Sequence, residues 1–221
     1  VDEAAFPSLI VTLPHRLQVL LSCASLMLVV GVMYTFPVVS GRLAAEMGFD
    51  DTDIDLIGAG FNIGTWLTVG GGVICDRLGP YMCTKLGAIL TAVGCLCCSL
   101  ACAGRLPQSS FAFSCYAFVL AQGAGWGYLS GVKVALLHFH ASDHATIVGA
   151  MVSYVALSSG VITQMYKCML SNSSLQLFFL SLLVFCCSLQ FLSLRNMETP
   201  TRDDDESTNK EDVGYGRSEL L

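Results

Sequence analysis

The sequence predicts an all-α, polytopic membrane protein with six transmembrane helices, and its composition and hydrophobic patterning both lead to this prediction. Of the 221 residues, 54% are hydrophobic and only 13% are charged, whereas a soluble domain normally has about 25% charged residues. So few charged side chains cannot cover a surface that faces water. The hydrophobic residues gather in six runs of about 20 to 27 residues, the length that a helix needs to cross a bilayer. These runs are 17–39, 54–75, 83–103, 111–137, 145–166 and 174–194.

The segment before the first run, residues 1–16, has Asp2 and Glu3 where a secretory signal would carry basic residues. We therefore expect a short N-terminal cytoplasmic segment, with the first span acting as its own signal anchor. Helices rather than strands follow from the lengths of the runs, since a transmembrane strand needs only about ten residues of alternating polarity. The transmembrane domain is thus expected to cover residues 17–194.

Six spans place both ends of the chain on one side of the membrane, and the basic residues indicate which side. Five basic residues fall on the side of the termini and three on the opposite side: Arg16, Arg77, Lys85, Arg195 and Arg202 against Arg42, Arg105 and Lys167. This excess favours cytoplasmic termini. The glycosylation sequon Asn172-Ser173-Ser174 falls on the opposite side, which agrees with that orientation.

Polar and aromatic residues are concentrated in the first, second, fourth and fifth spans, whereas the third and sixth contain mainly Leu, Ala, Gly, Cys, Phe and Ser. Polar groups are costly in hydrocarbon and tend to face protein partners or a water-filled cavity. We expect these four spans to line an interior and the other two to face lipid. The candidate cavity residues are Tyr34, Asn62, Trp66, Gln122, Trp126 and Tyr154. For any one of them, a hydrogen bond between helices or an interfacial position is an alternative, and Tyr34 and Tyr128 could belong to an aromatic belt.

Glycines recur at helical spacing in the second and fourth spans. Small residues at such spacing let two helices approach closely, and static packing or freedom to bend would each explain them. No strand precedes these glycines, so they do not indicate a dinucleotide-binding loop. They comprise the GxxxG pair Gly60 and Gly64, then Gly70, Gly71 and Gly72, and in the fourth span Gly123, Gly125, Gly127 and Gly131.

The cysteines, histidines and the single lysine of the fourth span indicate no catalytic or metal site. Most of the eleven cysteines lie inside apolar runs, where we expect them to pack as small residues. Lys133 is expected to extend toward the membrane interface. Histidines and an aspartate follow the fourth span without standard ligand spacing, so we expect a solvated loop at His138, His140, Asp143 and His144. No span has the clustered acidic residues or histidines that membrane enzymes generally need, so we predict neither enzymatic activity nor a metal or other cofactor.

Residues 195–221 differ from the rest of the chain in composition. They contain eight acidic and four basic residues, a net charge of −4 out of the chain's −6, and few apolar residues. Such a segment cannot bury a core, so we expect a disordered acidic cytoplasmic tail or central loop. The acidity of the chain therefore describes this segment, and it indicates no nucleic-acid partner.

The loop between the second and third spans contains the most specific motif. Gly72, Asp76, Arg77 and Gly79 stand at the spacing of the G-x-x-x-D-R-x-G-R-[RK] motif, and this loop resembles that of the major facilitator superfamily. Pro80 and Tyr81 replace the usual basic pair. Asp76 would end a helix, where it can pair with Arg77 or a neighbouring helix, and Gly79 would permit a sharp turn. Gln122-Gly123-Ala124-Gly125 is similar to the end of the superfamily's R-x-x-Q-G-x-G-x-A element, but Val119 stands in place of its arginine.

Within that superfamily, three segments resemble the nodulin-like and monocarboxylate-transporter-like branch: 31–37, 48–49 and 55–58. The resemblance implies a protein of twelve spans in two halves, each made of two inverted three-helix repeats. The six spans would then be the N-terminal half, completed by a missing C-terminal half or by a second copy. It also implies a gating loop that latches helices during an alternating-access cycle. The residues of this gating loop are Gly72, Asp76, Arg77 and Gly79.

The function expected from these features is secondary transport of a small solute across a lipid bilayer. The alternative is a six-span scaffold or receptor-like protein that transports nothing and acts through its acidic tail. The substrate and any coupled ion stay open, because no arginine or carboxylate lies in the middle of a span.

Overall fold

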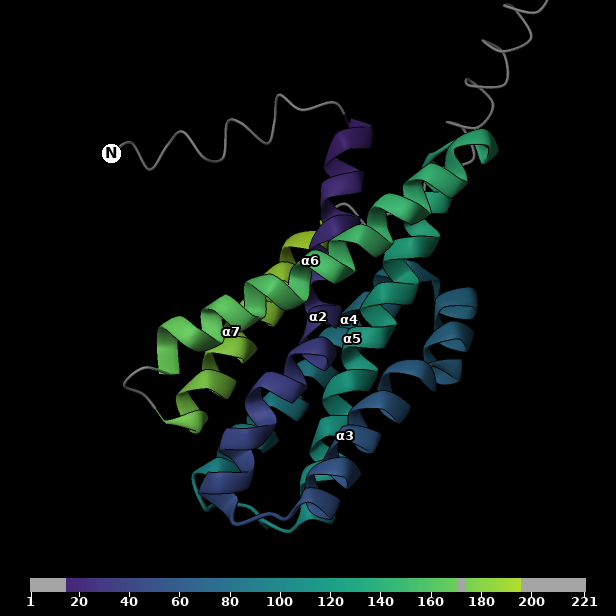
Figure 1. Cartoon of the computed structure of the whole chain (residues 1–221). Helices are drawn as coiled ribbons and strands as arrows, with labels where there is room; N and C mark the ends of the chain where they lie inside the picture. The colour runs from purple at the N-terminus through teal and green to yellow at the C-terminus, as the bar shows by residue number, and fades with distance from the viewer. Residues whose placement is uncertain (1–14, 171–173, 196–221) are drawn as a thin grey trace, which may run out of the picture.

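The computed structural model describes residues 15–170 and 174–195, which are almost entirely helical and contain no strand (Figure 1). The all-α prediction is therefore confirmed for this part of the chain. The predicted N-terminal segment and acidic tail lie outside these ranges, apart from the residues at their inner ends. The helices are α2 (His15–Met47), α3 (Asp51–Trp66), α4 (Val69–Cys102), α5 (Ser110–His138), the short 3₁₀-helix η1 (Ala141–Asp143), α6 (His144–Leu170) and α7 (Leu175–Leu194).

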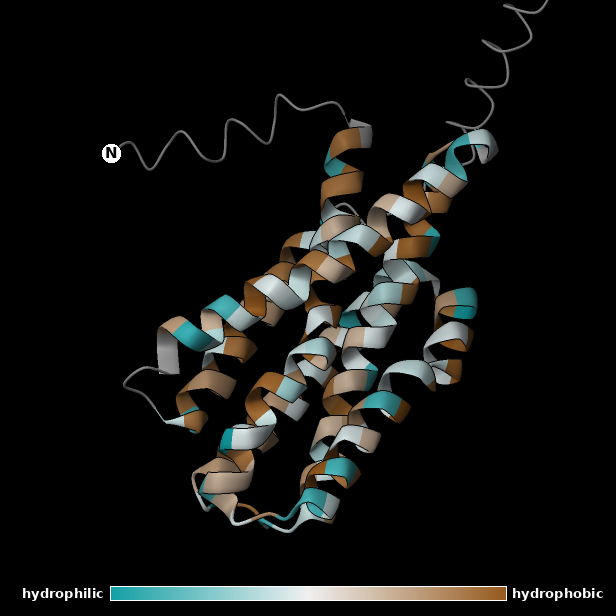
Figure 2. Cartoon of the chain, viewed as in Figure 1, coloured by the Kyte–Doolittle hydropathy of each residue, from teal (hydrophilic) through white to brown (hydrophobic). Residues whose placement is uncertain are grey.

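Several of these helices are long and apolar enough to cross a membrane. The four stretches that meet this description among the described residues are Leu17–Met47, Asp51–Cys102, His144–Cys168 and Leu175–Leu194. Figure 2 shows hydrophobic residues distributed along the helices, with hydrophilic residues between them. Large apolar side chains such as Phe111, Val184 and Phe191 are at least 66% exposed. An outer surface of this kind is solvated by lipid, and the chain is a multi-pass membrane protein.

The stretch Asp51–Cys102 turns back on itself at Gly79. Gly79 has φ 85° and ψ 165°, a left-handed conformation that only glycine adopts readily. The Sγ atom of Cys83 lies 3.5 Å from the carbonyl oxygen of Gly71. Twelve residues of continuous helix would separate these residues by about 18 Å, so the chain must fold back between them. Residues 80–102 accordingly run back toward the end of the molecule where α3 begins (Figure 1).

The same stretch is interrupted a second time, at Leu67 and Thr68, between the end of α3 and the start of α4. The hydrophobic run 54–75 predicts a single unbroken helix here, so this break is a feature that hydropathy does not reveal. At its other end α3 is closed by a capping box, in which Asp53 N–H donates to Asp50 Oδ1 at 2.8 Å. The first helix is longer than its apolar run, because α2 continues past Pro37 to Met47.

Helix α5 packs against α2, α3 and α4, and glycines allow its close approach. A Cβ atom at Gly123 of α5 would overlap with Thr91 of α4, and one at Gly64 of α3 would overlap with Phe118 and Ala121 of α5. A Cβ at Gly60 would overlap with Ser114. The GxxxG pair therefore packs α3 onto α5, as small residues at this spacing predict.

Helix α7 has one exposed side and one buried side. On the buried side, Ser193 Oγ lies 2.6 Å from Ser25 Oγ of α2, and Gln190 Nε2 lies 3.4 Å from Thr91 Oγ1 of α4. Gln190 is fully buried, and its Oε1 has no hydrogen-bond partner among the described residues. The prediction that the sixth span faces lipid fits only the side that carries residues such as Val184 and Phe191.

Adding a methyl group at Gly123 should destabilise the fold, whereas the same change at Gly160 should not. Gly123→Ala forces α4 and α5 apart at Thr91, and overpacking of this kind costs about 1–3 kcal/mol. Gly160 of α6 is exposed, and a Cβ atom there would meet no described atom within 4 Å. We expect Gly123→Ala to lower the thermal unfolding midpoint of the full-length protein in detergent, and Gly160→Ala to leave it unchanged. Equal midpoints for the two variants would contradict the packing described for α5.

Candidate functional site

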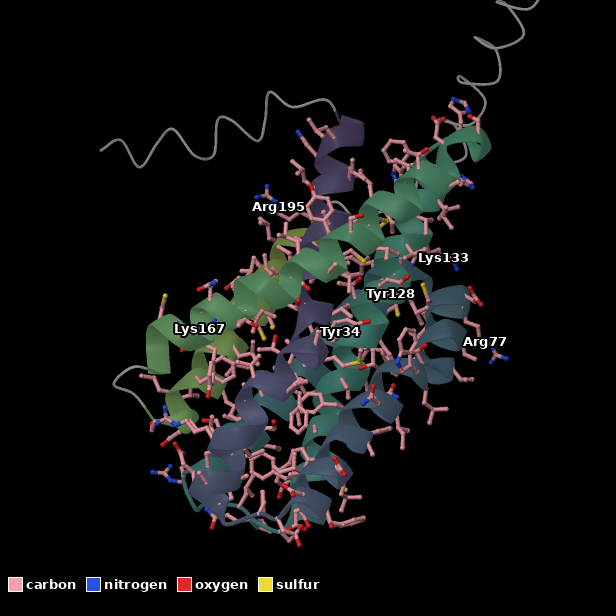
Figure 3. All side chains as sticks on the ribbon, in the orientation of Figure 1. Tyr34, Arg77, Tyr128, Lys133, Lys167 and Arg195 are labelled. Atoms are coloured by element: carbon pink, nitrogen blue, oxygen red, sulfur yellow. The ribbon has the colours of Figure 1, made fainter. Side chains whose placement is uncertain are left out.

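A cavity of about 300 Å³ lies between four helices. It is lined by residues of α2, α5 and α6, by the end of α3, and by the break that follows it. Figure 3 shows Tyr34 of α2 and Tyr128 of α5 close together near the middle of the molecule. These helices correspond to the first, second, fourth and fifth predicted spans, the ones expected to line an interior. The lining residues are Val30, Tyr34, Thr65, Trp66, Thr68, Gly125, Tyr128, Leu129, Val152 and Val155.

The cavity wall combines aromatic rings and hydroxyl groups with aliphatic side chains. None of its ten lining residues carries a charge. The Thr65 hydroxyl donates to the carbonyl of Phe61 in its own helix at 3.0 Å. Trp66 is 71% exposed and Tyr34 is 47% exposed, so their rings form open surface on the wall. This part of the wall can stack against a flat ring and form hydrogen bonds with polar atoms of the same solute, but it offers no ion pair.

The break at Leu67 and Thr68 is held by two side chains of α5. Gln122 Nε2 donates to the carbonyl oxygen of Leu67 at 2.6 Å. Trp126 Nε1 donates in turn to Gln122 Oε1 at 2.9 Å. Within a membrane an unpaired carbonyl is costly, so the Gln122 amide supplies a donor that the interrupted helix lacks.

Glycines let the break lie directly against α5. A Cβ atom at Gly71 would overlap with the indole ring of Trp126, and one at Gly125 would overlap with the side chain of Thr68. Cys83 adds a further contact, since its Sγ lies 3.5 Å from the carbonyl oxygen of Trp126. The wall of the cavity and the support behind it are therefore built from one tightly packed cluster.

The structure divides the six predicted cavity residues into three groups. Tyr34 and Trp66 line the cavity, while Gln122 and Trp126 lie behind the wall and hold the break. The other two candidates, Asn62 and Tyr154, are exposed and are not among the lining residues. Asn62 Nδ2 donates to the carbonyl of Gly58 in its own helix at 2.9 Å. A role in solute contact stays a prediction for all six.

Three further lining residues with hydroxyl groups are Thr65, Thr68 and Tyr128. Threonine in an apolar span commonly bonds to the backbone of its own helix, so the sequence gives no reason to single out Thr65 or Thr68. Tyr128 lies within the polar set of the fourth span, but its position also suits an aromatic belt. Both threonines lie within two residues of Trp66 in the sequence, and this nearness is the signal that could have identified them. The break that follows Trp66 gives no signal in the hydropathy.

Lys133 of α5 holds the end of the helical segment that carries the predicted gating loop. Its Nζ lies 2.8 Å from Asp76 Oδ1 and 2.9 Å from the carbonyl oxygen of Cys75. The lysine therefore bonds to the C-terminal end of that segment, where a cation is favoured by the helix dipole. Lys133 thus extends toward the exposed Asp76, and it is the partner of Asp76 that the sequence did not identify.

The other gating-loop residues are placed differently. Arg77 is exposed and points outward in Figure 3. Gly79 forms the turn, and a Cβ atom at Gly72 would meet no described atom within 4 Å. Near the following loop, His138 Nδ1 and His144 Nε2 each lie 2.9 Å from a backbone carbonyl oxygen. Among the described residues, no group of three or more His, Cys, Asp and Glu side chains could hold a metal ion.

The family model described as Nodulin-like matches residues 16–214 of the chain. This range contains α3, α4, α5, α6 and α7 entirely and all of α2 except His15. No curated protein matches the chain.

Removing the amino group of Lys133 should loosen the segment that ends at Asp76. Lys133→Met keeps most of the apolar stem but leaves the Cys75 carbonyl and Asp76 without this donor. The ion pair is solvent-exposed, with 78% exposure of the Asp76 side chain, and exposed pairs contribute about 0–1 kcal/mol. We expect amide hydrogen exchange in residues 72–79 to rise by about fivefold or less, measured by mass spectrometry. Lys167→Met, at an exposed lysine in the last turn of α6, is the matched control and should change nothing in that peptide.

Proposed function

The chain belongs to the nodulin-like family, and from that membership and its central cavity we propose that it is the solute-translocating membrane domain, or half of one, of a secondary transporter. The observation that carries the proposal is the uncharged cavity lined by α2, α3, α5 and α6. Transporters bind their solute near the middle of the membrane, between helices that move relative to one another. A cavity built at a break in a helix fits that arrangement.

The helices are proposed to cross the membrane six times. The crossings would be α2, residues 51–78, residues 80–102, α5, α6 and α7, arranged as two inverted repeats of three. The turn at Gly79 supports two separate crossings within the stretch 51–102, because it reverses the chain between them. Both termini and the loop at Gly79 would then face the cytoplasm.

The cavity wall would form one side of the translocation pathway. Trp66 and Tyr34 line the cavity yet remain largely exposed, which leaves an aromatic surface for a second wall to cover. A C-terminal half or a second copy would supply that wall, and rocking of one half against the other would open the site alternately to each side. The bond between Lys133 and Asp76 supports a gating role for the loop, because it ties the loop to α5.

Filling the cavity should block transport without disturbing the fold. Val152 lines the cavity and is 50% exposed, so Val152→Trp places an indole in the cavity with little effect on packing. We expect the initial rate of solute uptake to fall by about tenfold to a hundredfold, the range that a misfit in an apolar pocket produces. The measurement is uptake of radiolabelled monocarboxylates, amino acids, sugars and metal ions by proteoliposomes that contain the full-length protein.

Val184→Trp is the matched control, because Val184 is 66% exposed on α7 and does not line the cavity. It should leave uptake unchanged. Uptake of none of the solutes by the wild-type protein would favour the scaffold or receptor-like alternative. Equal uptake by both tryptophan variants would show that this cavity is not the translocation site.

A further inference from the structure

The break in the second span separates two residues of the cavity wall. Trp66 and Thr68 both line the cavity, and Leu67 lies between them with φ −81° and ψ 60°. The N–H of Thr68 donates to the carbonyl of Trp66 at 2.9 Å. These features define an inverse γ-turn, in which a single residue reverses the local chain direction. The position of Trp66 relative to Thr68 therefore depends on the conformation of one residue, Leu67.

The carbonyl of Leu67 accepts no backbone N–H among the described residues, because the helical bonds of α4 begin at the next residue. Gly72 N–H donates to Thr68 at 2.9 Å, and Leu67 N–H itself donates to Ile63. The donor that reaches the Leu67 oxygen is Gln122 Nε2, at 2.6 Å. A carbonyl inside a membrane is costly when left unpaired, so this one side-chain bond stabilises the turn.

The side chain at this position must both accept and donate a hydrogen bond. The indole N–H of Trp126 is a donor alone and the Leu67 carbonyl is an acceptor alone, so the group between them must accept on one side and donate on the other. Gln122 does both, with Oε1 toward Trp126 and Nε2 toward Leu67. The Trp126 ring is fixed in turn against Gly71, where any Cβ atom would overlap with it.

We propose that Gln122 is a positioning residue for the cavity. Its amide holds the turn at Leu67 and thereby fixes Trp66 and Thr68 in the wall that contacts the solute. Both polar atoms of Gln122 are engaged by the protein, so the residue acts through Trp66 and Thr68 rather than by touching the solute. This inference rests on the proposed transport function and assigns to Gln122 a control of solute affinity.

The test compares substitutions that remove different parts of the contact in the full-length protein. Gln122→Met keeps the length of the side chain and removes both bonds. Gln122→Glu keeps an acceptor for Trp126 and, when ionised, loses the donor to Leu67. Gln164→Met, at an exposed glutamine of α6, is the matched control. Hydrogen exchange of the amides in residues 64–72 is measured by mass spectrometry for each variant, together with the rate of uptake against concentration for the solute that the wild type accumulates most.

We expect Gln122→Met to raise exchange in residues 64–72 by about tenfold, as loss of a hydrogen bond to an otherwise unpaired carbonyl does. The concentration of solute that gives half-maximal uptake should rise by a similar factor, with a smaller change in the maximal rate. Gln122→Glu should raise exchange by no more than Gln122→Met does, because its carboxyl group keeps an acceptor for Trp126. Each variant is compared with the wild type at the same pH, and Gln164→Met should match the wild type throughout.

Unchanged exchange in Gln122→Met would overturn the proposal. Raised exchange with unchanged half-maximal concentration would also overturn it, since Gln122 would then stabilise the turn without affecting the solute site. That last result leaves transport itself intact. Absence of uptake by the wild type would instead refute the proposed function, and the role of Gln122 at a solute site with it.

Discussion

Close backbone approach between α5 and its neighbours is the constraint on which the rest of this structure depends. Helices in lipid gain little from burying apolar surface against each other, so their association relies on tight packing and on hydrogen bonds. Glycines supply the packing at Gly123 against Thr91 and at Gly64 against Phe118. Because the backbones lie so close, side chains of α5 reach the backbone carbonyls of the second span.

Two of these side chains bind opposite ends of one short helical segment. Gln122 bonds to Leu67, just before the segment, and Lys133 bonds to Cys75 and Asp76 near its end. The two side chains are eleven residues apart on α5, about 16 Å along the helix. Residues 69–78 are therefore fastened to α5 at both ends, with non-helical backbone on either side. The cavity wall and the loop at Gly79 are both attached to α5 in this way. A displacement of α5 would therefore move both of them.

The fold class and the approximate positions of the helices could be predicted because hydrophobic length and composition report directly on the solvent. The turn at Gly79 could also be predicted, since a glycine after a charged pair at the end of an apolar run favours reversal of the chain. The bonding partners of polar residues such as Gln122 could not be predicted. Their cost in hydrocarbon shows that they need a partner, but the partner is set by three-dimensional packing, and a backbone carbonyl such as that of Leu67 leaves no trace in the sequence. The break at Leu67 lies inside the hydrophobic run 54–75, and the length of that run gives no sign of it.

The fully buried Gln190 gives α7 a preferred rotation about its own axis. An apolar helix in lipid can turn about that axis at little cost, because most of its faces are equally compatible with acyl chains. Gln190 and Ser193 remove that freedom, since only one rotational setting brings both toward Thr91 and Ser25 and keeps the amide out of hydrocarbon. Gln190 Oε1 has no hydrogen-bond partner among the described residues, and this rotational setting therefore carries a local cost in free energy. Polar residues here select among orientations that hydrophobicity alone would leave equivalent.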